Sequence, residues 1–91
     1  MRSYHTWAFK ELYAKLPEHI QKQATAAYAI FEQNPNHPSL HFKLVSERIP
    51  PLYSVRIGLG YRALGLRIED DLIIWTWIGS HTAYDKLLKS H

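Results

Sequence analysis

Four side chains in the C-terminal half of the chain are of types suited to chemistry on a phosphodiester: Arg56, Arg62, His81 and Tyr84. The planar fork of an arginine guanidinium matches two phosphate oxygens, and histidine can give or take a proton near neutral pH. Tyrosine can stack on an unpaired base or donate a hydrogen bond. Because RNA carries its own nucleophile, the 2′-hydroxyl, this set is sufficient for cleavage of RNA without a metal or a cofactor.

Two predicted hairpins bring three of these side chains to one end of a sheet. Glycine accepts positive φ at little cost, so residues 58–60 predict a turn that places Arg56 opposite or diagonal to Arg62. A second turn, in the acidic run before the last strand, places Arg62 opposite Ile78, and His81 follows shortly after. Like charges that face each other across strands destabilise a hairpin, so this pairing favours a binding role.

Each of these residues also has a simpler interpretation. Two arginines on adjacent strands are commonly a surface feature, and a histidine after a strand is commonly a cap or turn residue. The ring of Tyr84 could pack on the sheet instead of meeting a base. Trp75 and Trp77 lie in an apolar strand and are expected in the core. The histidines outside the candidate site show no metal-ligand spacing, so no metal site is expected.

The N-terminal third has the apolar period of two helices. The first begins near Thr6, a suitable N-cap, and its apolar face consists of Phe9, Leu12, Tyr13 and Leu16. Pro17 cannot continue that helix but suits the first turn of a second one. The proline-containing segment 34–38 ends the second helix. These two elements predict a helical hairpin.

After Pro38 the apolar period becomes two, as in half-buried strands. The predicted strands are 40–45, 53–57, 61–68 and 72–78, with a loop at 47–52, turns at 58–60 and 69–71, and a closing helix at 84–90. The last strand is apolar on both faces and should be central or covered on both sides. The predicted fold class is α+β, with an N-terminal helical hairpin packed on a small twisted antiparallel β-sheet of about four strands and a short C-terminal helix. Residues 1–91 are expected to form a single domain.

The positive charge of the chain is concentrated in one segment. Residues 40–67 hold five basic residues and one acidic residue, a balance of +4, whereas the rest holds six basic and seven acidic residues, a balance of −1. Lys43 and Arg48 belong to this segment and are candidate RNA-binding residues, with exposed surface charge as the alternative. The hydrophobic fraction of 46% is typical of globular proteins, and no apolar run is long enough to span a bilayer. A cytoplasmic protein without membrane contact is therefore expected.

Three local strings give the chain a family resemblance. They are YSVRI at residues 53–57, YRALG at 61–65 and WIGSHTAYDKLL at 77–88. These strings, the two N-terminal helices, the basic antiparallel sheet and the closing helix resemble the RelE/ParE superfamily of bacterial type II toxins. RelE-like and HigB-like members commonly carry V-R-I, Y-R-x-L and a terminal G-x-H-x-x-Y-D signature.

The resemblance implies an mRNA interferase that cuts mRNA on the ribosome without a metal. It assigns Arg56 and Arg62 to the scissile phosphate and its transition state, His81 to acid or base catalysis, and Tyr84 to base stacking or auxiliary acid catalysis. It also implies a cognate antitoxin that buries the basic face, and hence a toxin–antitoxin hetero-oligomer.

One departure from the family pattern keeps two alternatives open. Many relatives read H-D-E-Y, whereas this chain has Thr82 and Ala83 between His81 and Tyr84. Without those acids, cleavage could be weakened or lost. The alternatives are a ParE-like toxin, which inhibits DNA gyrase and is not a nuclease, and a degenerate toxin that retains only antitoxin binding.

Overall fold

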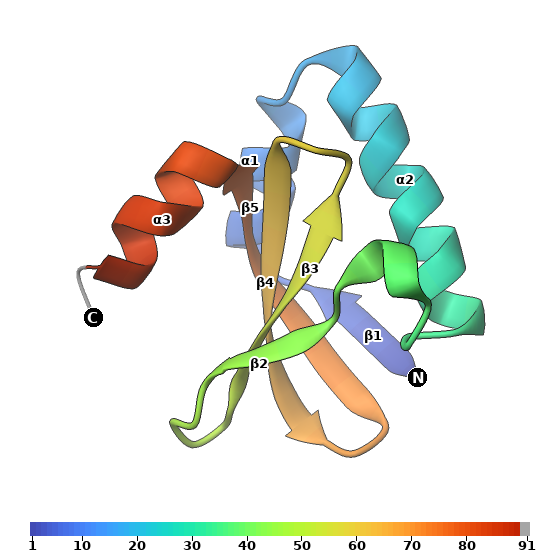
Figure 1. The fold of residues 1–91 in the computed structure, drawn as a ribbon, viewed down its shortest axis with the longest axis vertical. Coiled ribbons are helices and arrows are strands. Elements are labelled where there is room, and N and C mark those ends of the chain that lie inside the picture. The colour runs from blue at the N-terminus through green and yellow to red at the C-terminus, as the bar shows by residue number, and fades with distance from the viewer. Residues whose placement is uncertain (90–91) are drawn as a thin grey trace.

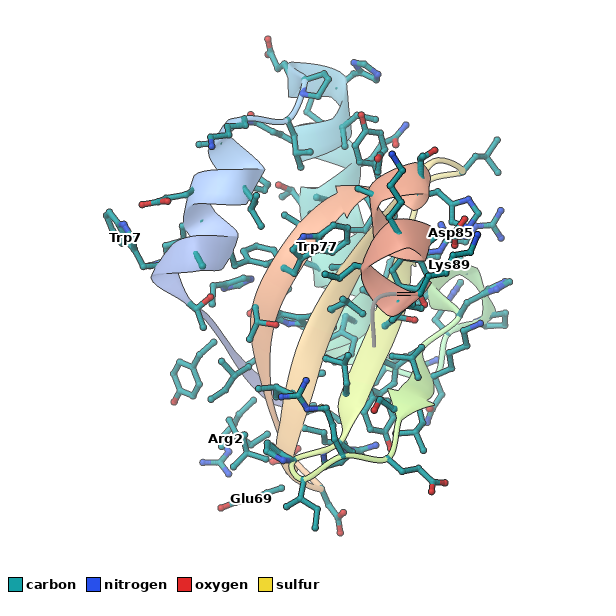
Figure 2. The ribbon with its side chains drawn as sticks, turned by 90° about the vertical axis from the view of Figure 1, so that its left-hand side faces the viewer. Arg2, Trp7, Glu69, Trp77, Asp85 and Lys89 are labelled. Atoms are coloured by element: carbon teal, nitrogen blue, oxygen red, sulfur yellow. The ribbon has the colours of Figure 1, made fainter. Side chains whose placement is uncertain are left out.

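The chain folds as a five-stranded sheet with helices on both faces (Figure 1). The computed structural model describes residues 1–89. In chain order the elements are β1 (Arg2–His5), α1 (Trp7–Ala14), α2 (Glu18–Gln33), a 3₁₀ turn η1 (Pro38–Leu40), β2 (Lys43–Ser46), β3 (Leu52–Ile57), β4 (Tyr61–Glu69), β5 (Leu72–Ser80) and α3 (His81–Lys89). Helices α1 and α2 cover one face, and α3 lies on the other (Figure 2). The α+β class is therefore confirmed.

The helical hairpin forms where the apolar period and the capping residues predict it. Thr6 is the N-cap of α1, and its Oγ1 accepts from the Phe9 amide at 3.1 Å. Pro17 separates the two helices, and Glu18 lies in the first turn of α2, near the positive end of the helix dipole. Helix α2 ends before Asn34, whose amide donates to the Ile30 carbonyl at 2.8 Å. None of the helices within residues 1–89 has the length and apolarity that a membrane span requires.

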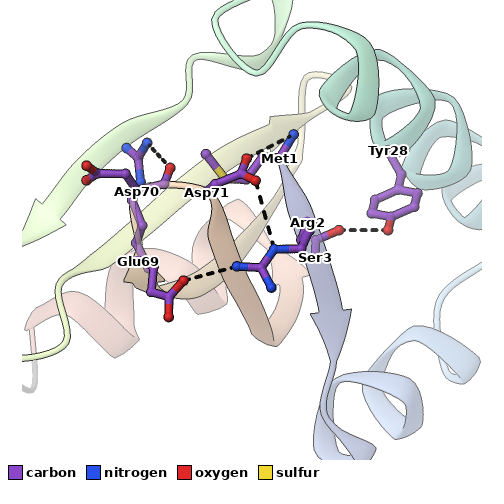
Figure 3. Close-up of polar contacts among 8 residues, drawn as sticks. Met1, Arg2, Ser3, Tyr28, Glu69, Asp70 and Asp71 are labelled. Atoms are coloured by element: carbon purple, nitrogen blue, oxygen red, sulfur yellow. Dashed lines mark hydrogen bonds and ion pairs between the residues drawn. The ribbon is translucent and has the colours of Figure 1, made fainter.

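The sheet has five strands in the order β1-β5-β4-β3-β2 and is mixed, which corrects the prediction of about four antiparallel strands. The additional strand, β1, runs parallel to β5, with Arg2 beside Leu72 and His5 beside Trp75. Polar contacts hold it in place (Figure 3): Arg2 bonds Glu69 at 3.0 Å, and the Ser3 hydroxyl lies 2.7 Å from the hydroxyl of Tyr28. Four residues with only one large apolar side chain carry no strand pattern of their own.

Two element boundaries also differ from the prediction. The strand expected from Leu40 begins at Lys43, because Leu40 closes η1 and His41 adopts left-handed backbone geometry with φ 46°. The closing helix begins at His81 instead of Tyr84. Its start is capped by the Ser80 hydroxyl, which accepts from the Ala83 amide at 3.1 Å. Ser90, the predicted end of this helix, lies outside the described residues.

Strand β5 is an interior strand, between β1 and β4, and is packed on both faces, as its apolar sequence predicts. Ile73, Trp75 and Ile78 belong to the core beneath α1 and α2, whereas Trp77 packs with Tyr84 of α3 on the opposite face. The residues of β5 that face this core are two positions apart from Ile73 to Trp75 but three positions apart from Trp75 to Ile78. Because side chains of a regular strand alternate between faces, a spacing of three requires an extra residue in the strand.

That extra residue is Thr76, a β-bulge. The predicted pairing holds at Gly65, which lies opposite Trp75, but Leu64 lies opposite Trp77. The shift moves the partner of Arg62 from the predicted Ile78 to Gly79. Bulges re-aim side chains near functional sites, and this one sets the position of the residues that follow β5.

Candidate nucleic-acid interface

The arginine pair predicted from the hairpin is present. Arg56 and Arg62 are direct partners on β3 and β4, on the sheet face that carries α3. The Arg56 Nε donates to the Gly58 carbonyl at 3.2 Å, and the Arg62 Nη1 donates to the Tyr61 carbonyl at 2.8 Å. Within residues 1–89 no carboxylate lies within 4.0 Å of either guanidinium. The two arginines are thus backbone partners, neither has a neutralising acid among these residues, and a phosphate would supply that neutralisation.

His81 lies at the same end of the sheet as the arginine pair. We call this the turn end: residues 58–60, which join β3 to β4, and the start of α3 (Figure 1). Gly79 is the partner of Arg62, and the His81 amide donates to the Gly60 carbonyl at 2.7 Å. The structure thus brings together the three side chains that the sequence placed at one sheet end.

The imidazole of His81 is exposed and has an acidic neighbour. Its Nε2 lies 3.6 Å from the Asp85 Oδ1 one helical turn later, and about half of each side chain is exposed. This carboxylate can orient the ring, and it is an acid of this chain near His81 even though Thr82 and Ala83 stand where many relatives carry acids. Sequence reasoning missed Asp85, because the closing helix was predicted to begin at Tyr84 and His81 was left outside it.

Tyr84 is a packing residue in this conformation. It is 6% exposed and belongs to a second core cluster with Leu52 and Leu64. Its ring lies 6.2 Å from the His81 ring at 22°, and 6.5 Å from the ring of Trp77. Stacking on a base would require α3 to move, so the direct effect of Tyr84 here is to support His81.

Of the two further basic candidates, the structure groups Lys43 with the arginine pair and separates Arg48 from it. Lys43 is the partner of Ser54 on β3, two residues from Arg56 and therefore on the same face. Arg48 is exposed in the loop between β2 and β3, at the sheet end opposite the turn end (Figure 1). Arg67 lies on the other face, where its guanidinium covers the rings of Phe42 and Tyr53 at 5.8 and 5.2 Å.

A second histidine near the arginine pair was missed from sequence. The Nε2 of His41 lies 3.4 Å from the Arg56 Nη1, and a neutral imidazole can accept that bond. The contact depends on the left-handed backbone at His41, a conformation in which histidine is enriched but still uncommon. The alternating pattern placed this residue in a strand and gave no sign of the turn. Within residues 1–89 no three side chains are grouped as a metal site would require.

With this geometry established, comparison with known proteins identifies the family. The family model of the ParE-like toxin domain matches residues 18–86. The chain belongs to the ParE-like toxin family. This result confirms the RelE/ParE superfamily membership expected from the three strings.

Solved structures of superfamily toxins share the fold of this ParE-like protein. A chain of the RelB–RelE antitoxin–toxin complex from Methanococcus jannaschii matches with a TM-score of 0.70 and 16% identity, over 92% of this chain and 96% of that one. YafQ from E. coli strain BL21(DE3) matches with a TM-score of 0.68 and 10% identity, over 91% and 96%. The isolated E. coli RelE toxin matches with a TM-score of 0.62 and 14% identity, over 97% and 95%. A search of curated protein sequences finds no significant match.

Proposed function

We propose that this ParE-like protein is the toxin of a toxin–antitoxin pair and an endoribonuclease that cleaves mRNA. The observation that carries the proposal is the directly opposed pair Arg56 and Arg62, without a carboxylate partner in residues 1–89, beside the exposed His81. Such a pair weakens the hairpin, and a phosphodiester between the two guanidiniums would relieve the repulsion.

In the proposed reaction the substrate supplies the nucleophile. The 2′-oxygen attacks the adjacent phosphorus, the bond to the 5′-oxygen breaks, and the products carry a 2′,3′-cyclic phosphate and a 5′-hydroxyl. Arg56 and Arg62 stabilise the charge that develops on the non-bridging oxygens. His81 transfers the proton, either from the 2′-hydroxyl or to the leaving 5′-oxygen, and Asp85 orients its ring.

The proposed partners are those that suit the basic sheet face on which Arg56, Arg62 and Lys43 lie. Lys43 extends the positive charge of the arginine pair along the sheet, which suits an RNA backbone and, in the resting state, an acidic antitoxin segment. The structurally similar chain from Methanococcus jannaschii comes from a complex of RelE with RelB, which supports a hetero-oligomer here. We place the action in the cytoplasm and on translating ribosomes, with no metal taking part.

Cleavage of mRNA in a translating extract tests this function. Wild-type protein is expected to fragment the message, and His81→Ala is expected to reduce the rate about 100-fold or more. His19→Ala, at an exposed position of α2 on the sheet face opposite α3, is the matched control and should cleave like wild type. Equal cleavage by His81→Ala and wild type would refute catalysis through this histidine.

Inhibition of DNA gyrase is the second candidate function. It is favoured by the ParE-like family model and by Thr82 and Ala83, where many nuclease relatives carry acids. Purified protein that blocks gyrase supercoiling and leaves mRNA intact would establish this function. Protein that does neither, yet binds its antitoxin, would be a degenerate toxin.

A further inference from the structure

A cavity of about 290 Å³ lies between α1, α2 and the sheet, on the face opposite the arginine pair. Most of its wall is apolar and comes from Ala27, Phe31, Val55, Ile57, Ala63 and Ile78. The two helices are tied where they join: Tyr13 Oη lies 3.2 Å from Thr25 Oγ1, and Gln21 Nε2 donates to the Tyr13 carbonyl at 3.0 Å. The space between helices and sheet therefore persists as a defined apolar chamber that opens to solvent.

Trp75, which lines the cavity, carries one buried polar atom that has no partner. Trp75 is 3% exposed, and its indole N–H makes no hydrogen bond within the described residues. The Cε3 edge of this indole lies against Gly65 of β4, where an added Cβ would be 2.8 Å away. The nitrogen-bearing edge therefore lies on the other flank, toward β1, where His5 is the neighbour of Trp75. A buried donor without an acceptor is unfavourable, so this end of the cavity is suited to an acceptor.

Two basic side chains line the cavity as well. His5 and Lys10 contribute to its wall, and burial, followed by the positive charge of Lys10, lowers the pKa of His5. His5 is the β1 neighbour of Trp75 in the strand register, so Lys10, His5 and Trp75 lie at the same end of the cavity lining. One end of the chamber thus carries a cation and an unpaired N–H donor, whereas the rest of the wall is mostly apolar, with the hydroxyl side chains of Tyr13, Thr25 and Tyr28 as the exceptions.

We propose that this cavity binds a small apolar carboxylate, with its hydrocarbon part between α2 and the sheet and its carboxylate at the His5, Lys10 and Trp75 end. An apolar cavity of about 150 Å³ holds benzene, so one of about 290 Å³ has room for a chain of about eight carbons or a bicyclic ring. The carboxylate supplies the acceptor that the indole N–H lacks and the negative charge that Lys10 favours. The site faces away from the RNA surface and does not depend on the proposed nuclease activity.

Octanoate and octanol test the proposal as a pair of probes that differ in the charged head alone. Titration calorimetry is expected to show octanoate binding at least about tenfold more tightly than octanol. In proton–nitrogen NMR spectra the indole N–H of Trp75 should shift on binding of octanoate. Trp7, 74% exposed on α1, and Trp77, on the opposite face, serve as internal controls and should not shift.

Two variants locate the ligand within the cavity. Lys10→Ala, at an exposed position, should weaken octanoate about threefold or more and leave octanol unchanged, whereas Lys15→Ala, beyond the cavity wall, should change neither. Ala27→Leu should remove binding of both probes while circular dichroism shows a folded protein. Equal affinities for acid and alcohol, no binding at millimolar concentration, or shifts confined to Trp7 and Trp77 would each overturn the proposal. None of these readouts involves RNA, so their failure is distinct from failure of the nuclease proposal.

Discussion

The opposed arginines predict a measurable conflict between stability and function. Arg56 and Arg62 are direct cross-strand partners without a carboxylate within 4.0 Å among residues 1–89. Like charges in this position destabilise a hairpin by about 0.2–1 kcal/mol. Each arginine also donates to one backbone carbonyl, at 3.2 and 2.8 Å, and each such bond contributes about 0.5–1.5 kcal/mol in the opposite sense. Single substitutions therefore mix two effects of opposite sign.

A double-mutant cycle separates these two effects. Arg56→Gln, Arg62→Gln and the double variant should show an unfavourable coupling of about 0.2–1 kcal/mol between the two arginines in urea unfolding at low salt. At 1 M salt the Debye length falls to about 3 Å, so the coupling should largely vanish. Arg67→Gln is the matched control on the opposite face. Its guanidinium covers two aromatic rings and donates to the Asp70 carbonyl at 2.7 Å, so its loss should destabilise by about 1–2 kcal/mol.

The same variants carry the functional half of the prediction. Arg56→Gln and Arg62→Gln should each lower the rate of RNA cleavage by about 100- to 1000-fold, as removal of one transition-state donor does. Arg67→Gln should leave that rate unchanged. A coupling energy of zero or of favourable sign at low salt, or full activity in either turn-end variant, would show that the arginine pair does not trade stability for catalysis.

Three further predictions concern other residues. Gly65→Ala should lower the free energy of unfolding in urea by about 1–3 kcal/mol, because the added Cβ would lie 2.8 Å from the buried indole ring of Trp75. Gly60→Ala is the control: its added Cβ would meet no atom within 4 Å, so its unfolding free energy should stay within about 1 kcal/mol of wild type. The lowered pKa of His5 means that the folded state binds fewer protons at this residue than the unfolded state. The contribution of His5 to the unfolding free energy is therefore full above pH 6.5 and is lost as the pH falls below 6.5. A pH series of unfolding free energies should show this slope in wild type and lose it in His5→Phe. Asp85→Asn should lower the cleavage rate about 2- to 5-fold at unchanged melting temperature, because the pair with His81 is half exposed; a larger loss, or none, would contradict an orienting role.

The parts of the fold that depend on local pattern were predictable from sequence. The cap at Thr6 and the break at Pro17 define the two helices, and the glycine turn fixes Arg56 opposite Arg62. Strand β1 was missed because its parallel pairing with β5 joins segments about seventy residues apart and needs no local alternation. Long-range pairing leaves no period in a four-residue stretch.

The candidate site was predictable up to the point where the backbone departs from regular geometry. The bulge at Thr76 moves the partner of Arg62 by one residue, and such a shift depends on how the tryptophans pack against Gly65 and α3. The left-handed turn that brings His41 to Arg56 is likewise a tertiary outcome. The family strings identified His81, but only the helix start at that residue showed that Asp85 is its acidic neighbour.

The central claim is that the turn end cleaves RNA by activating the substrate's own 2′-hydroxyl. It is tested most directly by comparing an RNA that the protein cuts with the same RNA carrying a single 2′-deoxy nucleotide at the cut site. We expect the all-ribose RNA to yield a 2′,3′-cyclic phosphate and a 5′-hydroxyl, and the deoxy-substituted bond to stay intact. Cleavage of both bonds at equal rates, or products with a 5′-phosphate, would contradict this claim.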